Sequence, residues 1–531
     1  MEFGNTVAAV LTVMRDENKQ YKDYLPQEAI TAGEKLVEIT KNLWDDVRKT
    51  IVELVHKEIP MQYPYVAVWW YSVLVEIEKD EDIFNEFIAY VRNNRRAFSA
   101  NTQYFLYYQL KNKLFVYSNL DGQETKRELW RYFIEVVNEF SEKVHASLQI
   151  IPEKDRNENL ILVITEQFLG VNHGPTKTAL DRCKAIKMVL NKSVLLINTA
   201  EIASSVGEIP YMGTGVANYR IEKLHECEQS WKGVKIPYYQ CENNMPDINE
   251  LDKLLEKIRE LAPLRVISIG GSGILSNLVN RIIPVLTIGL CPSDLEFTTT
   301  QYQTLGRKLQ STDTKLLSEL KFPTEHVIES TFTSGLKTQT EHITRSDLQI
   351  PDDKFLMCVV GGRLNMEVTD AFLSAIEKIM QDDMYLVFWG YFDKYEESIE
   401  RYSRLKKNSS YLGFCQDILS RLDICDLYVN PVRKGGGTSC VEAMYKGVPV
   451  VSVNYGDVAV NAGEDFLVGN YEEMQKVIQR YHDDKDFYNV MSDKAKKRAA
   501  VLMDTETEFV NIMLEVDRRE KMREEKNGTG L

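Results

Sequence analysis

Long hydrophobic runs are missing from the sequence. No segment approaches the roughly 18 uncharged apolar residues that a membrane-spanning helix needs, and the apolar, aromatic stretch at 65–75 is too short. The first residues, from Met1 to Thr6, also lack the basic stretch and the cleavage site of a secretory signal. We therefore expect a cytoplasmic protein without a transmembrane segment, so that any contact with a membrane would be peripheral.

Cysteine pairs and metal-ligand clusters are missing as well. All eight cysteines lie at or after Cys183, and no two of them form a C-x-x-C pair. This pattern offers neither a disulfide framework nor a cysteine zinc site. The D-x-D triplets at 80–82 and 484–486 stand in hydrophilic, charged stretches and are typical of a solvated face. The sequence therefore predicts no bound metal and no resident cofactor.

The sequence has fewer basic residues than acidic ones. The 531 residues include 64 Lys and Arg against 79 Asp and Glu, which gives a formal net charge of −15. Nucleic acid is not an expected partner, because binding it normally needs a basic face. Hydrophobic residues make up 44% and charged residues 27%, which is typical of a globular protein. The chain is too long for one hydrophobic core, so we expect three domains.

The first 150 residues indicate helices alone. Apolar residues recur at spacings of three and four, and charged side chains fill the other positions, in three segments: 30–55, 83–91 and 129–144. The aromatic-rich stretch at 104–117 is typical of a core between packed helices, with a binding groove as the alternative. We predict an all-helical domain over residues 1–150.

Beyond the polar stretch at 152–159, short β-branched runs alternate with helical segments. The first series predicts strands at 160–165, 193–198, 265–269 and 285–289, with helices at 176–190 and 248–261. The second predicts strands at 355–360, 385–389, 427–430 and 449–453. Such alternation indicates parallel sheets with crossover helices. We predict an α/β fold with two Rossmann-like lobes, 155–348 and 349–503, facing each other across a cleft, and a charged helix over 504–531.

The strongest chemical signal is the run VNPVRKGGGTSCVEAMYKGVPVV at 429–451, which leads from a predicted strand through a glycine-rich loop into a helix. Its glycines allow the backbone to approach a bulky anion, and its hydroxyl residues fall where N-cap residues belong. Amide N–H groups at the helix start then face the ligand, as a diphosphate requires. A basic pair precedes the loop, and a glutamate one turn into the helix is placed to accept hydrogen bonds from a ribose. The residues in question are Arg433, Lys434, Gly435, Gly436, Gly437, Thr438, Ser439 and Glu442. A structural glycine turn is the alternative.

With its Glu-Ala and G-V-P-V-V continuation, this segment resembles the nucleotide-binding lobe of GT-B glycosyltransferases, in particular bacterial relatives of the O-GlcNAc transferase family. Arg363, in V-G-G-R-L after a strand, is similar to the element that meets the donor phosphate. Phe414 and Asp417, in Y-L-G-F-C-Q-D, resemble the loop that holds the base. The resemblance is good over 355–455, weaker over 160–345 and absent over 1–150. It implies that the second lobe binds a nucleoside diphosphate sugar, UDP-sugar favoured, as co-substrate.

A histidine loop follows the first predicted strand of the first lobe. Its order, G-x-N-H-x-P-T at 170–176, is similar to the loop that carries the active-site histidine of O-GlcNAc transferases, although Gly174 separates His from Pro here. His173 is therefore a candidate catalytic base, because the ordinary pKa of imidazole lies near the working pH. Substrate binding and a structural role remain as alternatives. We expect Asn172 and Thr176 to line the cleft.

A second glycine loop, I-G-G-S-G-I at 269–274, lies between a predicted strand and a predicted helix. It matches a dinucleotide fingerprint only partly, because no acidic partner for a ribose follows at a strand end about 20 residues on. We expect Gly270, Gly271 and Ser272 to line the cleft, with a plain tight turn as the alternative.

One departure from the GT-B pattern bears on mechanism. Many retaining GT-B enzymes carry two glutamates separated by seven residues, and Lys434 stands where the first is expected, with Glu442 as the second. A lysine cannot replace a carboxylate, so inversion is favoured. The resemblance predicts a metal-independent hexosyl- or N-acetylhexosaminyltransferase acting on a protein or glycan. Residues 1–150 have no glycine-rich loops and contain aromatic-rich helices, so we expect them to form an acceptor-side or partner-binding domain. An inactive GT-B-like binding or chaperone partner of a glycosylation system and a nucleotide-sugar epimerase are the alternatives.

Overall fold

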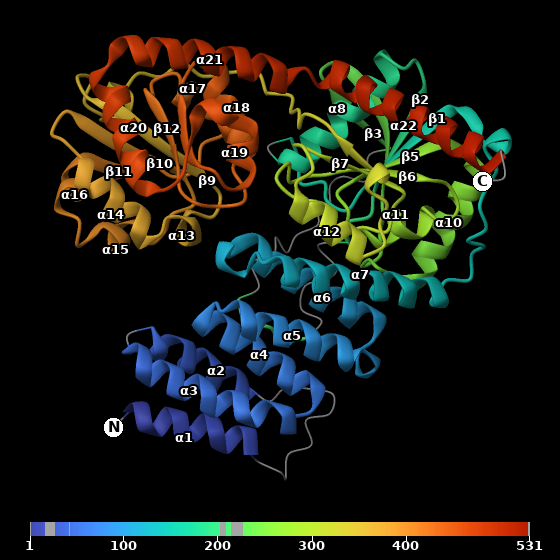
Figure 1. The fold of residues 1–531 in the computed structure, drawn as a ribbon, viewed down its shortest axis with the longest axis horizontal. Helices are drawn as coiled ribbons and strands as arrows, with labels where there is room; N and C mark the ends of the chain where they lie inside the picture. Colours follow the sequence, from blue (N-terminus) through green and yellow to red (C-terminus); the bar gives the residue numbers. More distant parts are fainter. Residues whose placement is uncertain are drawn as a thin grey trace.

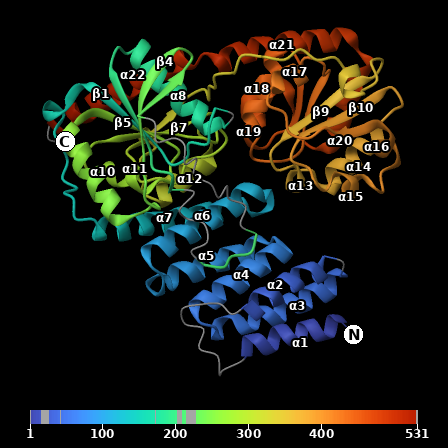
Figure 2. The ribbon, with the colours of Figure 1, turned by 180° about the vertical axis from the view of Figure 1, so that it is seen from behind.

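The computed structural model describes residues 2–15, 27–41, 43–171, 173–201, 209–213 and 227–528. An N-terminal helical region is followed by two lobes, each built on a mainly parallel sheet, as Figure 1 shows from one side and Figure 2 from behind. The predicted α/β class, with two Rossmann-like lobes after a helical region, is confirmed.

The helical region consists of α-helices, two of which have side-chain caps at their starts. Asp80 accepts hydrogen bonds from the N–H groups of Asp82 and Ile83 at the start of α5 (Glu81–Asn93), and Ser99 accepts one from the N–H of Thr102 at the start of α6 (Ala100–Val116). The helices are α1 (Glu2–Arg15), α2 (Gln27–Thr40), α3 (Asp45–Glu58), α4 (Pro64–Glu78), α5 (Glu81–Asn93), α6 (Ala100–Val116) and α7 (Gln123–Lys143). Short 3-10 turns connect some of them, at Ile59–Met61, Arg95–Ala97 and Ser118–Leu120.

The first lobe contains an eight-stranded sheet with the order β3-β4-β2-β1-β5-β6-β7-β8, in which β3 runs antiparallel to β4 and the other pairs are parallel. Its strands are β1 (Asn157–Thr165), β2 (Ser193–Asn198), β3 (Glu228–Trp231), β4 (Val234–Gln240), β5 (Pro263–Ile269), β6 (Val285–Ile288), β7 (Tyr302–Leu305) and β8 (Val327–Glu329). Its helices are α8 (Gly174–Met188), α10 (Ile248–Leu261), α11 (Ile274–Val279) and α12 (Ser311–Glu319). The 3-10 turns Glu153–Asp155 and Thr324–His326 precede β1 and β8.

The second lobe contains a six-stranded parallel sheet with the order β11-β10-β9-β12-β13-β14. Its strands are β9 (Phe355–Gly361), β10 (Met384–Gly390), β11 (Ser409–Tyr411), β12 (Leu427–Asn430), β13 (Val450–Val453) and β14 (Leu467–Val468). Its helices are α13 (Leu364–Glu367), α14 (Asp370–Ile379), α15 (Tyr395–Ile399), α16 (Ser403–Asn408), α17 (Ile418–Leu422), α18 (Gly437–Tyr445), α19 (Gly456–Ala462), α20 (Tyr471–Asp483) and α21 (Lys485–Met503). The 3-10 turns Ser346–Leu348 and Glu464–Phe466 lie before β9 and β14.

The chain passes between the lobes twice. After α21 it returns to the first lobe, where α22 (Thr505–Gly528) lies along α8 (Figure 1). The apolar face of α22, with Phe509 and Val516, is buried in the core of that lobe, and Arg265 binds Asp517 on the same helix at 2.8 Å. At the crossing, Ser334 of the interlobe linker donates a backbone hydrogen bond to Leu502 of α21. The two crossings therefore lie side by side.

The helical region and one face of the first sheet share a hydrophobic core. Trp130 of α7 is 1% exposed, its ring stacks on Phe297 at 5.6 Å, and its indole N–H donates to the carbonyl of Thr298 at 2.9 Å. α7 also packs on α11 and α12. Because this packing joins residues far apart in the sequence, the helical region contributes directly to the stability of the first lobe.

We expect Trp130→Ala to lower the free energy of unfolding by about 3–5 kcal/mol, the usual cost of removing a large buried aromatic side chain. Trp44→Ala is the matched control, since Trp44 is 85% exposed, and it should change stability by less than about 0.5 kcal/mol. Urea unfolding followed by circular dichroism measures both. Equal stabilities for the two variants would show that the contact between α7 and the first lobe is dispensable.

Candidate functional site

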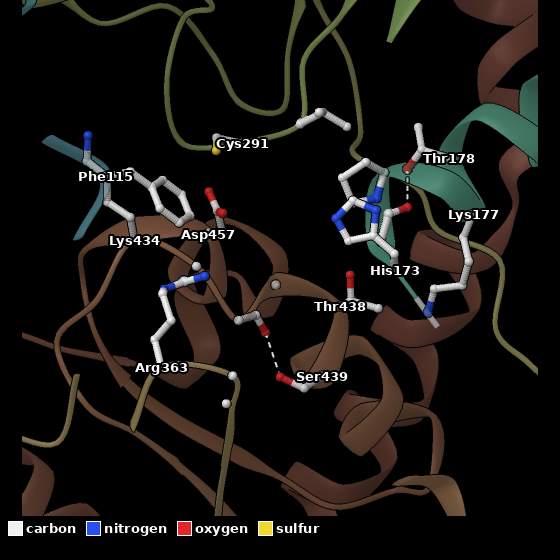
Figure 3. Close-up of a pocket in the computed structure, with 18 of the residues that line it drawn as sticks. Phe115, His173, Lys177, Thr178, Cys291, Arg363, Lys434, Thr438, Ser439 and Asp457 are labelled. Carbon is white, nitrogen blue, oxygen red and sulfur yellow. Dashed lines mark hydrogen bonds between the residues drawn. The ribbon is translucent and has the colours of Figure 1, made fainter. Parts of the chain in front are cut away.

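A cleft of about 820 Å³ lies between the two lobes (Figure 3). Its walls come from the loops at the carboxyl ends of the strands in both lobes and from α6 of the helical region. Such crevices are where open α/β sheets bind ligands, and this volume suits a small organic ligand.

The glycine-rich loop opens into this cleft and leads into α18. Gly436 is the N-cap residue with φ of 94°, and α18 begins at Gly437. Thr438 and Ser439 therefore lie in the first turn, and the expectation that they occupy the N-cap is wrong. The left-handed backbone at the cap requires glycine, and a β-carbon there would also stand 2.6 Å from the guanidinium of Arg433. The first N–H groups of α18 have no helical acceptors, so they form an anion-binding end.

The two hydroxyl residues of the loop have different surroundings. The hydroxyl of Ser439 donates to the carbonyl of Gly436 at 2.9 Å and shares a hydrogen bond with the hydroxyl of Tyr428. Thr438 lies opposite the histidine loop, and a β-carbon on Gly174 would be 3.6 Å from its Oγ1. The first lobe thus closes directly over the start of α18.

Arg433 stabilises this loop through buried hydrogen bonds and does not present its charge to the cleft. Its side chain is 4% exposed and donates to Glu367, Asn430, the carbonyl of Val360 and Tyr428, each at 2.8 Å. Glu367 also pairs with Arg363 at 2.8 Å.

Arg363 remains half-exposed at the cleft wall. Its guanidinium lies over the ring of Phe115 at 4.7 Å, next to Gly435. Phe115 belongs to α6, so the helical region contributes to the wall at the glycine loop. Most of the aromatic stretch at 104–117 is core, including Tyr104, Phe105 and Tyr107, which are fully buried.

Lys434 is held in ion pairs that join all three parts of the molecule. Its Nζ lies 2.6 Å from Asp121 of the helical region and 3.0 Å from Asp294 of the first lobe. Lys126 bridges the same carboxylates at 3.1 and 2.8 Å. We call Asp121, Lys126, Asp294 and Lys434 the charge junction. Burial alone would lower the pKa of Lys434, but the two carboxylates raise it above its ordinary value, so the ammonium stays charged.

Glu442 is paired across the cleft. Its Oε1 lies 3.6 Å from Nζ of Lys177 on α8, and both side chains are largely buried. Burial raises the pKa of Glu442, and Lys177 offsets part of that rise. Sequence reasoning did not identify Lys177, although it stands one turn after His173 on the same helix.

His173 is the N-cap residue of α8 and lines the cleft (Figure 3). Its Nδ1 lies 3.3 Å from Oγ1 of Thr176, which in turn accepts a hydrogen bond from the N–H of Leu169. Burial, with a smaller contribution from the nearby charge of Lys177, lowers the pKa of His173 to about 4. The imidazole is therefore neutral near pH 7 and a weaker base than in water.

The remaining residues that the sequence predicts for the site do not all line the cleft. Thr176 is fully buried beneath the histidine loop, and Thr178 lines the cleft instead. Asn172 lies outside the described residues. Phe414 is half-exposed at the cleft and stacks on Tyr391 at 5.6 Å with an interplanar angle of 6°. Asp417 lines the cleft, but its carboxylate accepts hydrogen bonds from the N–H groups of residues 340, 341 and 420.

The second glycine loop is buried under α6 and does not line the cleft. The hydroxyl of Ser272 lies 3.1 Å from that of Tyr107 and 2.5 Å from Nζ of Lys111. Gly270 and Gly271 leave room for two glutamate side chains, since a β-carbon on Gly270 would be 3.1 Å from Oε1 of Glu166 and one on Gly271 would be 2.8 Å from Cβ of Glu296. The tight-turn reading of this loop is therefore the one that the structure supports.

Three buried carboxylates, which we call the carboxylate cluster, surround this loop: Glu166 after β1, Glu201 after β2 and Glu296 after β6. Glu201 accepts hydrogen bonds from the N–H groups of residues 274 and 275, and Glu296 accepts one from residue 290. Glu166 and Glu296 line the cleft. Sequence reasoning missed the cluster, although an acidic residue directly after a predicted buried strand is a usable signal.

Within the described parts of the chain, no group of three or more His, Cys, Asp or Glu side chains is arranged to hold a metal ion. The helices of those same parts include none that is long and apolar enough to cross a membrane.

The second lobe and the overall fold each have known counterparts. Residues 341–498 match the family described as glycosyl transferases group 1. No curated protein matches the chain significantly. A solved variant of the O-GlcNAc transferase of Thermobaculum terrenum is similar, with a TM-score of 0.55 and 11% identity over 98% of each chain. This likeness includes the helical region and confirms the GT-B fold.

Two further solved structures are similar over a smaller share of the chain. HepE of Anabaena, in complex with UDP, is 13% identical, with a TM-score of 0.48 over 67% of this chain and 99% of its own. The sucrose-phosphate synthase of Thermosynechococcus elongatus is 11% identical, with a TM-score of 0.48 over 69% of this chain and 100% of its own.

We expect Asp121→Ala to destabilise the protein by about 3–5 kcal/mol, because it leaves two buried ammonium groups with one shared carboxylate. Glu124→Ala removes an exposed carboxylate from the same part of the chain and should cost no more than about 1 kcal/mol. Chemical unfolding of both variants measures the difference. Similar losses in the two would mean that the charge junction adds little to stability.

Proposed function

We propose that the protein is an inverting, metal-independent glycosyltransferase that moves a sugar from a nucleoside diphosphate sugar to a protein or glycan acceptor. The observation that carries the proposal is the helix end formed by Gly436 and Gly437, which opens into the interlobe cleft beside Arg363. The family match of residues 341–498 supports the same class of reaction. The name of the Thermobaculum terrenum neighbour supports a UDP-linked N-acetylhexosamine among the donor candidates.

In this proposal the diphosphate binds at residues 435–439. The N–H groups of the helix end and the guanidinium of Arg363 stabilise the negative charge that develops on the leaving diphosphate, a role that a metal ion would otherwise fill. Lys434 is already neutralised by Asp121 and Asp294. It therefore acts on the donor mainly by fixing the backbone of the loop.

The nucleoside lies beyond the diphosphate, toward Glu442 and Phe414. Glu442 keeps one carboxylate oxygen close to Lys177 and offers the other to the ribose hydroxyls. The half-exposed ring of Phe414, backed by Tyr391, offers a flat apolar surface for the base.

The acceptor approaches from the first lobe and α6. His173 faces the start of α18 from that side, where it contacts the reacting hydroxyl or the donor as a neutral imidazole. The helical region contributes to both walls, because Phe115 lies at the glycine loop and Lys111 lies beside the carboxylate cluster.

Calorimetric titration with UDP, in buffer containing EDTA, tests the donor site. Wild-type protein should bind without added metal, and Glu442→Ala should weaken binding by about 1–3 kcal/mol, because the ribose hydroxyls lose their acceptor. Glu442→Gln, which keeps an acceptor oxygen, should lose less. Glu472→Ala, an exposed glutamate of the same lobe, is the control. Unchanged affinity in a folded Glu442→Ala variant would remove this assignment, and binding that appears only with Mn²⁺ would contradict metal independence.

The stereochemistry of the product tests the mechanism. Double displacement needs a carboxylate nucleophile near the sugar, and Lys434 occupies the place of the first glutamate of the retaining pattern. We therefore expect an α-linked donor to yield a β-linked product, read from the anomeric proton by NMR. An α-linked product would show retention.

A further inference from the structure

Glu166 stands out among the buried acidic groups because one of its oxygens has no partner. The residue is 6% exposed, it lines the cleft, and its Oε2 makes no hydrogen bond to any described residue. Leaving a buried polar atom unpaired is costly, so native proteins pair such atoms with protein, water or ligand. A ligand that enters the cleft here can supply the missing donor.

The surroundings of Glu166 determine which ligand that is. Three carboxyl groups lie together around the second glycine loop with one ammonium group, that of Lys111. Burial and their mutual repulsion raise the pKa of Glu166 to about 7 and that of Glu201 to about 8, so this wall lacks the concentrated positive charge that a diphosphate needs. The anion-binding end of α18 and Arg363 lie on the other wall of the cleft, in the second lobe. The ligand at Glu166 must therefore bring a hydrogen-bond donor, and it is not the phosphate part of the sugar donor.

We propose that Glu166 binds the nucleophilic O–H group of the acceptor and takes its proton during sugar transfer. This inference rests on the proposed function. The acceptor oxygen forms a bond to the anomeric carbon while the bond from that carbon to the phosphate oxygen breaks, and the nucleoside diphosphate leaves with the electron pair. The O–H proton ends on the carboxylate of Glu166, so atoms and charges balance. The acceptor class is a hydroxyl, from a serine or threonine side chain or from a sugar.

The environment of Glu166 supports this role over that of His173. Burial raises the pKa of Glu166 to about 7, with Lys111 lowering it and Glu296 raising it, whereas burial lowers that of His173 to about 4. A base that titrates near the working pH is the better proton acceptor. The titratable groups that face Glu166 from α6 and from the neighbouring loops are Tyr104, Tyr107, Tyr108, Lys111, Glu201 and Glu296.

The test uses the full-length protein and needs no identified acceptor. UDP release from UDP-GlcNAc and UDP-glucose is measured with water as acceptor, and then with serine- and threonine-containing peptides and simple glycosides, between about pH 5 and 9. The variants are Glu166→Gln, Glu166→Asp and, as control, Glu158→Gln, which changes an exposed glutamate at the other end of β1. Dissociation constants for UDP and for UDP-GlcNAc, and melting temperatures, are measured for each.

The wild-type rate should rise with pH through about 7 and then level off. Glu166→Gln should lower the rate by about 10²–10⁴-fold, abolish that rise and leave both dissociation constants within about twofold. Glu166→Asp should keep a pH-dependent rate even if the glutamine variant is unstable, and Glu158→Gln should match the wild type.

A retained rate or a retained rise with pH in Glu166→Gln would overturn the inference. Weaker binding of UDP-GlcNAc but not of UDP would also overturn it, because it would place Glu166 at the donor sugar. A wild-type protein that binds no UDP, or that binds it without turnover on any acceptor, would instead refute the proposed function on which the inference rests.

Discussion

The charge junction holds the helical region and the two lobes in one arrangement. Each of the three parts contributes at least one charge, and Lys434 is the member that comes from the donor loop itself. Its neighbour Arg433 binds four acceptors within the second lobe. Two adjacent basic residues therefore fix the glycine loop from opposite sides, one to its own lobe and one to the rest of the molecule.

This arrangement explains why the cleft is built from three parts and not two. A loop that is pinned to Asp121 of the helical region cannot be positioned by the second lobe alone. Phe115 lies against the same loop, so α6 lines the cleft from the glycine loop to the carboxylate cluster. The N–H groups at the start of α18 and Arg363 therefore lie on the second-lobe wall, while Glu166 and Glu296 lie on the opposite wall beside Lys111.

Local features of this protein could be predicted from the sequence. The expected strands at 193–198 and 427–430 coincide with β2 and β12, and the expected helix at 248–261 coincides with α10, because periodicity and flanking turns are local signals. The strands β3, β4, β7, β8, β11 and β14 were not predicted. All of them except β4 are short, and β3, β8, β11 and β14 lie at sheet edges. The glycine-rich loop could be predicted because its glycines, its hydroxyl residues and the helix that follows them form one continuous stretch of the sequence.

The partners of the site residues could not be predicted. Lys434 and Asp121 are 313 positions apart, and no pattern in one segment indicates the other. The same holds for Lys177 and Glu442, which belong to different lobes. The N-cap expectation for Thr438 failed for a different reason, because the left-handed backbone at Gly436 places the N-cap two residues earlier than Thr438, so that both hydroxyl residues fall inside the first turn.

The side-by-side crossings of the chain limit how this molecule can move. The hydrogen bond between Ser334 and Leu502, with a small apolar cluster that includes Leu336 and Val441, joins the two crossings at this edge. α22 packs in the core of the first lobe and is paired with Arg265, so the second crossing is anchored at its far end and restrains sliding of one lobe past the other. The charge junction and the Lys177–Glu442 pair also join the two lobes, across the cleft. Both hold opposite charges out of water, so a rise in ionic strength would loosen them far less than it would an exposed ion pair.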